Sequence, residues 1–370
     1  MASPCADAAA SREPLLAATA PEPLFSVIIV NYRQWEETGA LVRQLCQSFC
    51  VRQGGAEIIV IDNRSARHRL AGRLRRLPGV SLRRWRRNRG FARAVNEGCR
   101  LSRGTWIVLL NPDVTVPDGF LDELSLLAER LSTSEPKTGV IGLELRNPDS
   151  SRQLSAGPPP TVTRTIAGLL LPRTRRKYHR PPSGRREVSW VTGCGLLLRR
   201  ECFDAVGGFD ERFFLYYEDA DFCRRAKELG WSVWYEPALH LTHHRPLQSR
   251  AVPPHLRACT RLALLTYAGK HWSPWQARLM HRLVALEARM RRGWARWRGQ
   301  VENVRTFSVL LELVKDSWRG DHSAAHRRLE RLLREKERHR GAAPVHRHSQ
   351  PQPGRSPPRL PDRGLPARPR

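Results

Sequence analysis

Three carboxylates stand within four residues of this chain, at Glu218, Asp219 and Asp221, directly after the aromatic-rich segment 213–217. Carboxyl groups that lie close together beside apolar rings raise one another's pKa, which suits a general base for a hydroxyl group. The same residues could form the acidic first turn of a helix, since basic residues follow toward its other end. The two interpretations are compatible, because a helix start can hold a catalytic carboxylate in place.

Two further groups are of types that bind a divalent cation. Asp113 follows an apolar run, and the pair His243 and His244 follows the apolar-rich segment 231–241. A carboxylate at a strand end can bind a hard cation that bridges diphosphate oxygens, and an imidazole could complete the site or contact the diphosphate. The sequence Asn-Pro-Asp is also ordinary turn chemistry, and a histidine pair is more often structural, so each motif alone leaves a structural role open.

Polar residues that could contact a nucleotide end two other apolar runs. Asn31 follows the sequence FSVIIV, and Asp62 ends the sequence EIIVID. Their side chains could hydrogen-bond a nucleobase or a ribose, although a strand-terminating Asx turn uses the same residue types. In the segment 88–98, a helix that opens near Gly90 would present backbone N–H groups and positive charge to an anion.

These groups need elements that bring them together, and the apolar runs supply them. Short runs of β-branched residues that begin at residues 25, 57 and 105 are separated by helical patterns, which predicts parallel strands in an α/β sheet. Ligands bind at the carboxyl ends of such strands. A capped amphipathic helix is predicted over 116–131. The segment 147–189 is rich in Pro, Arg and Ser and is predicted to be a long loop.

Composition narrows the partners and the compartment. The 370 residues include 64 Lys and Arg against 35 Asp and Glu, a formal charge of +29 that calls for nucleic acid, an anionic lipid or a phosphorylated substrate. The eight cysteines include no C-x-x-C pair, which favours a reduced cytosolic chain. The first residues do not resemble a secretory signal, and no uninterrupted apolar run is long enough to span a membrane. Any membrane contact is therefore expected to be peripheral.

Changes in composition predict four segments. These are a disordered leader at 1–22, a catalytic domain at 23–250, a basic helical extension at 251–340 and a disordered Pro- and Arg-rich tail at 341–370. The extension could rest on an anionic membrane or pack against the catalytic domain. Its region carries the following tryptophans: Trp272, Trp275, Trp294, Trp297 and Trp318.

Taken in order, five segments of this chain resemble the inverting glycosyltransferase family 2, and within it the rhamnosyltransferase-like branch of polysaccharide assembly. The segments are FSVIIVNY, EIIVID, NRGFARAVNEG, WIVLLNPDV and the block from WVTGCG to KELGW. The resemblance covers residues 24–245. It implies a GT-A fold, which is a Rossmann-like mixed sheet flanked by helices, with Mg²⁺ or Mn²⁺ as cofactor. It also implies a nucleotide-sugar donor, a glycan or lipid-linked acceptor, and a role in cell-surface polysaccharide synthesis.

The resemblance assigns roles to residues as well. Asp219 becomes the catalytic base and Glu218 its neighbour at the acceptor. The donor residues are Asn31, Asp62, Asn88, Gly90, Phe91 and Asn96, and the metal residues are Asp113 and His243. The chain departs from the family pattern at Asn111, where the first Asp of the metal motif would stand, and at Arg245 to Leu247, where two glycines are usual.

The basic composition also allows a different class of function, nucleic-acid binding. The Arg-rich segment 73–93, with Trp85 and Phe91 among its arginines, could bind nucleic acid, but no zinc-finger, RNP or helix-turn-helix signature accompanies it, so a nucleic-acid partner is disfavoured. A second alternative is a binding protein that keeps the fold without turnover. For the enzyme, the expected location is the cytoplasm, with peripheral contact at the inner face of the plasma membrane.

Overall fold

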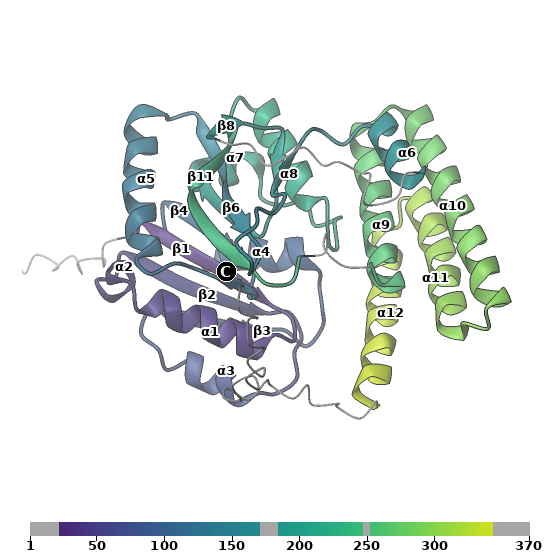
Figure 1. Cartoon of the computed structure of the whole chain (residues 1–370), viewed down its shortest axis with the longest axis horizontal. Helices are drawn as coiled ribbons and strands as arrows, with labels where there is room; N and C mark the ends of the chain where they lie inside the picture. Colours follow the sequence, from purple (N-terminus) through teal and green to yellow (C-terminus); the bar gives the residue numbers. More distant parts are fainter. Residues whose placement is uncertain (1–21, 171–183, 247–251, 343–370) are drawn as a thin grey trace, which may run out of the picture.

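The computed structural model describes residues 22–170, 184–246 and 252–342. The predicted leader at 1–22 and tail at 341–370 lie outside the described residues except for residues 22, 341 and 342, and the predicted boundary at 250 also lies outside them. One large sheet with helices on both faces occupies the first part of the chain, and a group of helices follows it (Figure 1).

The strands are short and mostly buried. They are β1 (Phe25–Asn31), β2 (Ala56–Asp62), β3 (Val80–Arg84), β4 (Trp106–Leu110), β5 (Val114–Thr115), β6 (Thr138–Arg146), β7 (Ala156–Gly157), β8 (Arg186–Glu187), β9 (Trp190–Val191), β10 (Gly195–Arg199) and β11 (Ser232–His243). The helices are α1 (Trp35–Cys46), α2 (Phe49–Arg52), α3 (Arg69–Leu74), α4 (Phe91–Arg100), α5 (Phe120–Ser134), α6 (Val162–Leu170), α7 (Arg200–Val206), α8 (Glu218–Glu228), α9 (Pro254–His271), α10 (Pro274–Trp297), α11 (Val301–Trp318) and α12 (His322–Ala342).

The main sheet is mixed. Its order is β3-β2-β1-β4-β10-β6-β11-β5, with β8 paired to β11, while β7 and β9 form a separate two-stranded sheet. Strands β1 to β4 run parallel, β10 enters antiparallel between β4 and β6, and β11 runs parallel to β6. The predicted α/β fold class, a mixed sheet flanked by helices with a helical C-terminal region, is confirmed.

Alternate residues of the central strands enter two different cores. In β1, Phe25, Val27 and Ile29 pack with α1, α3 and α5, whereas Ile28 and Val30 pack with α4 and α8. Every residue of β1 and β4 is buried, as a strand covered on both faces requires. The continuous apolar runs in the sequence therefore correspond to the centre of a three-layer structure.

The prediction of a long loop over 147–189 is wrong in part. Within its described residues the chain forms the short strands β7 and β8 and the helix α6, and residues 171–183 lie outside the description. Ile166 of α6 packs against the core of the C-terminal helices. Composition concealed this helix because its stability comes from a tertiary contact and not from the local Pro- and Arg-rich sequence.

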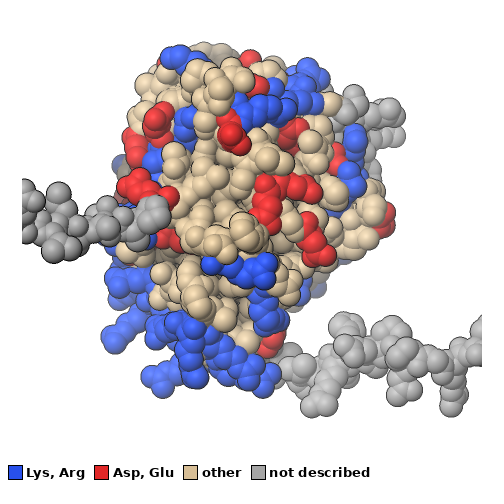
Figure 2. Space-filling model, turned by 90° about the vertical axis from the view of Figure 1, so that its left-hand side faces the viewer, with Lys and Arg blue, Asp and Glu red and all other residues tan. Residues whose placement is uncertain are grey.

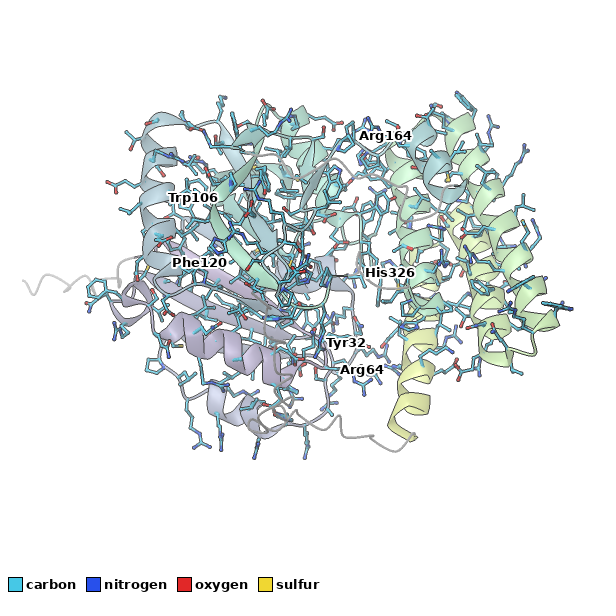
Figure 3. The ribbon with its side chains drawn as sticks, viewed as in Figure 1. Tyr32, Arg64, Trp106, Phe120, Arg164 and His326 are labelled. Atoms are coloured by element: carbon cyan, nitrogen blue, oxygen red, sulfur yellow. The ribbon has the colours of Figure 1, made fainter. Side chains whose placement is uncertain are left out.

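The helices α9 to α12 share a core of their own and attach to the sheet through an aromatic side chain. Phe214, in the loop before α8, is buried among them, and its ring meets the imidazole of His326 edge to face with 5.4 Å between ring centroids. His326 lies on the side of α12 that faces the sheet (Figure 3), and burial lowers its pKa to about 4. Within the described residues, no helix combines the length and the apolar character needed to cross a bilayer.

The packing of α4 on β1 leaves no room for a side chain at Gly98. A Cβ atom at this position would lie 2.6 Å from Cγ2 of Ile28. We expect Gly98→Ala to lower the free energy of unfolding by about 1–3 kcal/mol, because overpacking of a dense core forces backbone shifts. Chemical denaturation followed by circular dichroism measures this change.

Gly72 of α3 is the matched control. It is exposed, and a Cβ atom there would meet nothing within 4 Å. Gly72→Ala should leave stability unchanged or raise it by up to about 1 kcal/mol, since Ala is the better helix former. Equal effects of the two substitutions would show that α4 does not pack on β1 as described.

Candidate active site

The polar ends of the central strands meet at one edge of the sheet. Strands β1 and β2 pair in parallel with Asn31 opposite Asp62, and the backbone N–H of Asn63 donates to the carbonyl of Asn31 at 2.8 Å. The residues after these ends, Tyr32 and Arg64, lie at the same edge (Figure 3). The structure therefore brings together the polar residues at the strand ends, as the parallel strand pattern predicted.

Asn31 and Asp62 are fully buried, and other protein groups occupy their hydrogen-bonding atoms. The Asn31 amide donates to Asp62 Oδ1 at 3.1 Å and to Ser65 Oγ at 3.2 Å, while its oxygen accepts from Gln34 and Thr38. An Asn side chain has two donors and two acceptor sites, so its capacity is used. Asp62 Oδ2 also accepts from Arg84 Nε at 2.8 Å. In this structure the two residues hold the loops at the strand ends.

The loop before α4 fits tightly against the loop before α8. Gly90 has φ +91°, and a Cβ atom there would lie 2.7 Å from the carbonyl oxygen of Phe214. The next backbone N–H, of Phe91, donates to the same oxygen at 2.7 Å. Asn88 accepts from the Gly90 N–H, and the Asn63 amide donates to the Gly90 carbonyl. Only glycine allows both this φ and this approach.

Asn96, the last of the predicted donor residues, lies further along α4 and serves a different loop. Its oxygen accepts from the Phe209 N–H at 2.9 Å, and its amide donates to the Phe209 carbonyl at 2.8 Å. The backbone of Gly208 packs against it, since a Cβ atom there would lie 2.9 Å from the Asn96 oxygen. Asn96 thus holds the turn between α7 and α8.

The predicted catalytic carboxylates begin α8, directly after two residues in a strained backbone conformation. Tyr216 and Tyr217 have φ of 75° and 67°, which is unusual for residues with side chains. Such strain persists where surrounding structure enforces it and is frequent at functional sites. Here it turns the chain so that Glu218 and Asp219 start the helix.

The two carboxylates differ in their surroundings. Asp219 Oδ2 accepts from the backbone N–H of Gly193 at 3.1 Å, and its other oxygen accepts from Ala220 N–H at 2.8 Å. Glu218 is buried, and its Oε2 has no hydrogen-bond partner within the described protein. Asp219 is therefore held as an acceptor, whereas Glu218 has one buried oxygen whose hydrogen-bonding capacity is unused within the described protein.

Burial and the neighbouring Asp219 charge raise the pKa of Glu218 well above its usual range. Burial also raises the pKa of Asp219, but the backbone N–H groups of Ala220 and Gly193 act in the opposite direction and favour the ionised form. The pKa of both groups is raised, and that of Glu218 further than that of Asp219, so Glu218 holds its proton to a higher pH. An ionised carboxylate beside a neutral one suits proton abstraction at Asp219.

The third carboxylate of the cluster, Asp221, points to the C-terminal helices. Its Oδ1 lies 2.7 Å from His271 Nε2 and 2.6 Å from Lys270 Nζ, and its Oδ2 accepts from Arg225. Burial opposes ionisation, but His271, Lys270 and Arg225 outweigh it and lower the pKa of Asp221. Sequence reasoning missed Lys270 and His271, because nothing local to them signals a partner 50 positions away.

Asp113 and His243 are brought together by strand pairing. The short strand β5 pairs antiparallel with β11, with Val114 opposite His243, and His243 Nε2 lies 3.6 Å from Asp113 Oδ2. The other candidate, His244, contacts Thr115 Oγ1 at 2.7 Å instead. Burial opposes ionisation of Asp113, but His243 and Arg245 lower its pKa. His243 is therefore the histidine that shares a site with Asp113.

Gln153 is a site residue that sequence reasoning missed. It is buried, and its amide nitrogen donates to carbonyl oxygens that include that of His243 at 2.7 Å. Its oxygen must then be the acceptor for His243 Nδ1, 2.9 Å away. The proton of neutral His243 is thereby assigned to Nδ1, and the protonated ring, with a second hydrogen on Nε2, is the form that attracts the Asp113 carboxylate. A carbonyl partner of this kind orients metal-binding histidines.

The carboxylate pair and the Asp113 pair lie on adjoining segments. Gly193 bonds Asp219, and the next residue, Cys194, accepts a hydrogen bond from the backbone of Asn111 at 3.1 Å. The turn after β4 then leads to Asp113. Within the described residues, no group of three or more His, Cys, Asp and Glu side chains could hold a metal by itself. A cation here would need oxygen ligands from a substrate or water.

The Arg-rich segment 73–93 does not form a single free stripe. Within it Arg84 pairs with Asp62, Arg93 with Glu211 and Arg83 with Glu97. Figure 2 shows Lys and Arg gathered at the lower edge of one face, where Figure 1 places α3, and acidic side chains across its middle. This distribution adds no support to the nucleic-acid alternative.

Comparisons with known proteins agree on one family. The sequence model described as "Glycosyl transferase family 2" matches residues 26–206. The N-acetylglucosaminyl-diphospho-decaprenol L-rhamnosyltransferase of Mycobacterium tuberculosis is 31% identical over 242 residues, which cover 60% of this chain and 78% of that protein. The rhamnosyltransferase WbbL of Escherichia coli is 27% identical over 173 residues, which cover 45% of this chain and 64% of that protein.

The tautomer of His243 can be tested directly. Nitrogen-15 correlation spectra above pH 8 should show the proton of wild-type His243 on Nδ1, with the signal assigned through a His243→Gln variant. In Gln153→Leu the acceptor is lost, and we expect a mixture of tautomers. A wild-type proton on Nε2 would contradict the assigned orientation of Gln153.

The raised pKa of Glu218 predicts a pH-dependent stability difference. The folded state keeps a proton that the unfolded chain releases above about pH 4.3. The stability from this proton is present at low pH and is lost as the pH rises through the raised pKa. Glu218→Gln keeps a neutral group at all pH values, so its melting temperature relative to wild type should increase steadily from pH 5 to pH 8.

Glu228, exposed at the other end of α8, provides the control for this measurement. The melting temperature of Glu228→Gln relative to wild type should not show that increase. A Glu218→Gln difference that is equal at pH 5 and pH 8 would show that Glu218 is ionised throughout.

Proposed function

Because the chain belongs to glycosyl transferase family 2, we propose that this glycosyltransferase moves a sugar from a nucleotide-sugar to a lipid-linked glycan acceptor, with Asp219 as the base. The observation that carries the assignment of the base is the pair at the start of α8, where Asp219 is held by the Gly193 N–H beside the buried Glu218. We propose that Asp219 is the ionised member of this pair and that Glu218 holds the proton, because the pKa of Glu218 is raised further.

The proposed reaction is a single inverting displacement. The acceptor hydroxyl gives its proton to Asp219, and its oxygen forms a bond to the anomeric carbon of the donor sugar. The bond from that carbon to the diphosphate oxygen breaks on the opposite side, and its electrons leave with the nucleoside diphosphate. We propose that Glu218, whose buried Oε2 has no partner within the described protein, hydrogen-bonds the acceptor. No covalent intermediate with the protein is required.

Asp113 and His243 are proposed to hold the divalent cation. Asp113 Oδ2 and His243 Nε2 lie 3.6 Å apart, and in neutral His243 the contact of Nδ1 with Gln153 leaves the Nε2 lone pair for a ligand bond. The two residues would therefore fit a cation that takes its other ligands from the diphosphate and water. Such a cation stabilises the charge of the leaving diphosphate. We propose Mn²⁺ over Mg²⁺, because an imidazole ligand suits Mg²⁺ poorly.

For the donor, we propose that the loop of Asn88 and Gly90 and the start of α4 at Phe91 receive the nucleotide-sugar. The first turn of a helix favours an anion, and α4 begins at this edge of the sheet. Asn31, Asp62 and Asn96 support the donor site through the loops that they hold, since their own hydrogen bonds are internal.

The substrates are inferred from relatives. The name of the mycobacterial relative describes the transfer of L-rhamnose to a diphospholipid-linked N-acetylglucosamine, and we propose a related reaction here, in cell-surface polysaccharide synthesis. For an enzyme with a lipid-linked acceptor, we propose a location in the cytoplasm with peripheral contact at the inner face of the plasma membrane. We propose no role for nucleic acid.

Release of nucleoside diphosphate from dTDP-rhamnose and from UDP- and GDP-sugars, with a lipid-linked acceptor and Mn²⁺, Mg²⁺ or EDTA, tests the proposal. We expect turnover of one donor, fastest with Mn²⁺ and abolished by EDTA. Asp219→Asn should lower kcat by about 10²–10⁴-fold, because the amide cannot take the proton.

Asp204→Asn is the matched control, since this carboxylate is exposed on the neighbouring helix α7. It should keep wild-type turnover. Equal activity of Asp219→Asn and wild type would reject Asp219 as the base, whereas full turnover in EDTA would reject only the cation.

A further inference from the structure

The helix α10 exposes a stripe of large apolar side chains. Leu286, Met290, Trp294 and Trp297 are 51%, 67%, 55% and 75% exposed. At 100° per residue they fall within an arc of about 80° on the helix surface. The Trp294 and Trp297 rings lie 5.0 Å apart, and Val301 at the start of α11 is 79% exposed as well. A contiguous exposed apolar surface of this kind indicates an interaction site.

A row of arginines runs beside this stripe. Arg289, Arg292 and Arg296 lie about 60° to 120° from the nearest residue of the stripe around the helix, between the stripe and the buried face. The buried face contains Val284, Ala288 and Ala295. The helix therefore presents, in order around its axis, a buried face, a cationic row and an exposed apolar stripe. This is the pattern of a helix that lies in the interface of an anionic membrane.

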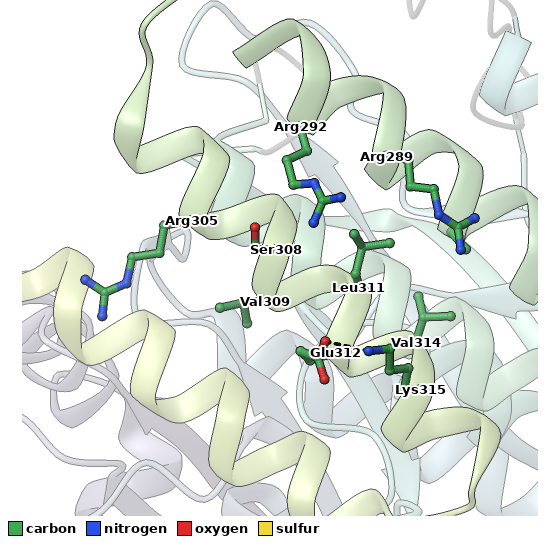
Figure 4. A pocket seen from close by; sticks show the side chains of 10 residues that line it. Arg289, Arg292, Arg305, Ser308, Val309, Leu311, Glu312, Val314 and Lys315 are labelled. Atoms are coloured by element: carbon green, nitrogen blue, oxygen red, sulfur yellow. Dashed lines mark hydrogen bonds and ion pairs between the residues drawn. The ribbon is translucent and has the colours of Figure 1, made fainter. Parts of the chain in front are cut away.

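The arginine row opens into a pocket between α10 and α11. Arg289 and Arg292 extend from α10 toward α11, where Arg305, Ser308 and Lys315 also line the pocket (Figure 4). The pocket has a volume of about 450 Å³, and its apolar lining includes Leu311 and Val314. Cations and a hydroxyl above apolar side chains match a phosphate group that is attached to acyl chains.

The charges of this pocket are not balanced from within. Lys315 is paired with Glu312 at 2.9 Å, and Arg305 with Glu335 at 2.7 Å. Arg289 and Arg292 form no ion pair with any residue that the structure describes. The carboxylate that lines the pocket, Glu312, is the one paired with Lys315, so the guanidinium groups of Arg289 and Arg292 are available for an external anion.

We propose that this α10 surface binds an anionic phospholipid membrane, with a lipid phosphate between Arg289 and Arg292 and with Trp294 and Trp297 in the interfacial layer. Tryptophan prefers this depth, and cations near an anionic leaflet add to binding. The exposed apolar stripe favours lipid over nucleic acid, which offers no such layer. The inference uses no residue of the catalytic site and holds whatever sugar is transferred.

Flotation of the full chain with vesicles tests the proposal. We expect binding to vesicles of phosphatidylcholine with 30% phosphatidylglycerol and little binding to phosphatidylcholine alone. Arg289→Gln with Arg292→Gln should weaken binding about tenfold or more. Trp294→Ala with Trp297→Ala should remove the binding that survives high salt, because that part is apolar.

The control is Arg75→Gln with Arg76→Gln, an equal change of charge at exposed positions after α3. Its effect should stay below about twofold. An equal loss in this control would overturn the proposal in favour of general attraction by the net charge. Failure of the wild-type protein to bind anionic vesicles would also overturn the proposal. So would a dimer, seen by light scattering, that the Trp substitutions dissociate, since the stripe would then join two copies of the chain.

Thermal melts should show that all three double variants are folded. Their turnover of donor in detergent with a short-chain acceptor should equal that of wild type, because none of them changes the catalytic site. Loss of vesicle binding with turnover retained supports the membrane surface. Lack of turnover in wild type would instead concern the proposed reaction alone.

Discussion

The hydrogen bond from the Phe91 N–H to the Phe214 carbonyl is the contact on which the site depends. It joins the donor-side loop to the loop that carries the catalytic carboxylates, and it forms because Gly90 has no side chain to separate them. On one side, the Gly90 carbonyl is held by Asn63 at the end of β2. On the other, Phe214 leads into the strained Tyr217 that starts α8. The distance between the proposed donor loop and the proposed base is thus set by a contact between backbone atoms. Such a contact is more rigid than one between side chains, which can change rotamer.

The C-terminal helices belong to the same framework. Phe214 places its ring in their core while its carbonyl faces Phe91, so one residue contacts both halves of the molecule. Three residues after Glu218, Asp221 is bound by Lys270 and His271 of α9. A buried carboxylate without these partners would be costly, and the helix that carries Asp219 therefore depends on α9 for its position. The extension therefore supports the helix of the proposed base and also carries the proposed membrane surface.

Buried carboxylates in this protein differ in the direction in which their pKa is shifted. The pKa of Asp113 is lowered because His243 and Arg245 outweigh desolvation, whereas burial and the charge of Asp219 both raise the pKa of Glu218. The first arrangement favours a group that stays ionised and binds a cation. The second keeps a proton near the acceptor. The sign of the nearest charge, and not burial itself, separates the two roles.

The sequence by itself determined the layered sheet, its polar edge and the family. Continuous apolar runs can be stable only as strands covered on both faces, and Asp113, Glu218 and Asp219 stand next to such elements in the chain. The departure at Asn111 was also visible there, and it leaves the proposed cation site with one carboxylate and His243.

Only the tertiary structure decided which partners these residues have. Gln153 meets His243 across 90 residues, and Asp221 meets His271 across 50, and no local pattern encodes either contact. The same holds for Asn31 and Asp62, which the sequence placed at the nucleoside and which the structure shows bonded to their own loops. Hydrogen bonds and charges act over a few ångströms, so the function of a polar side chain is fixed by its neighbours in space and not by its position in the chain.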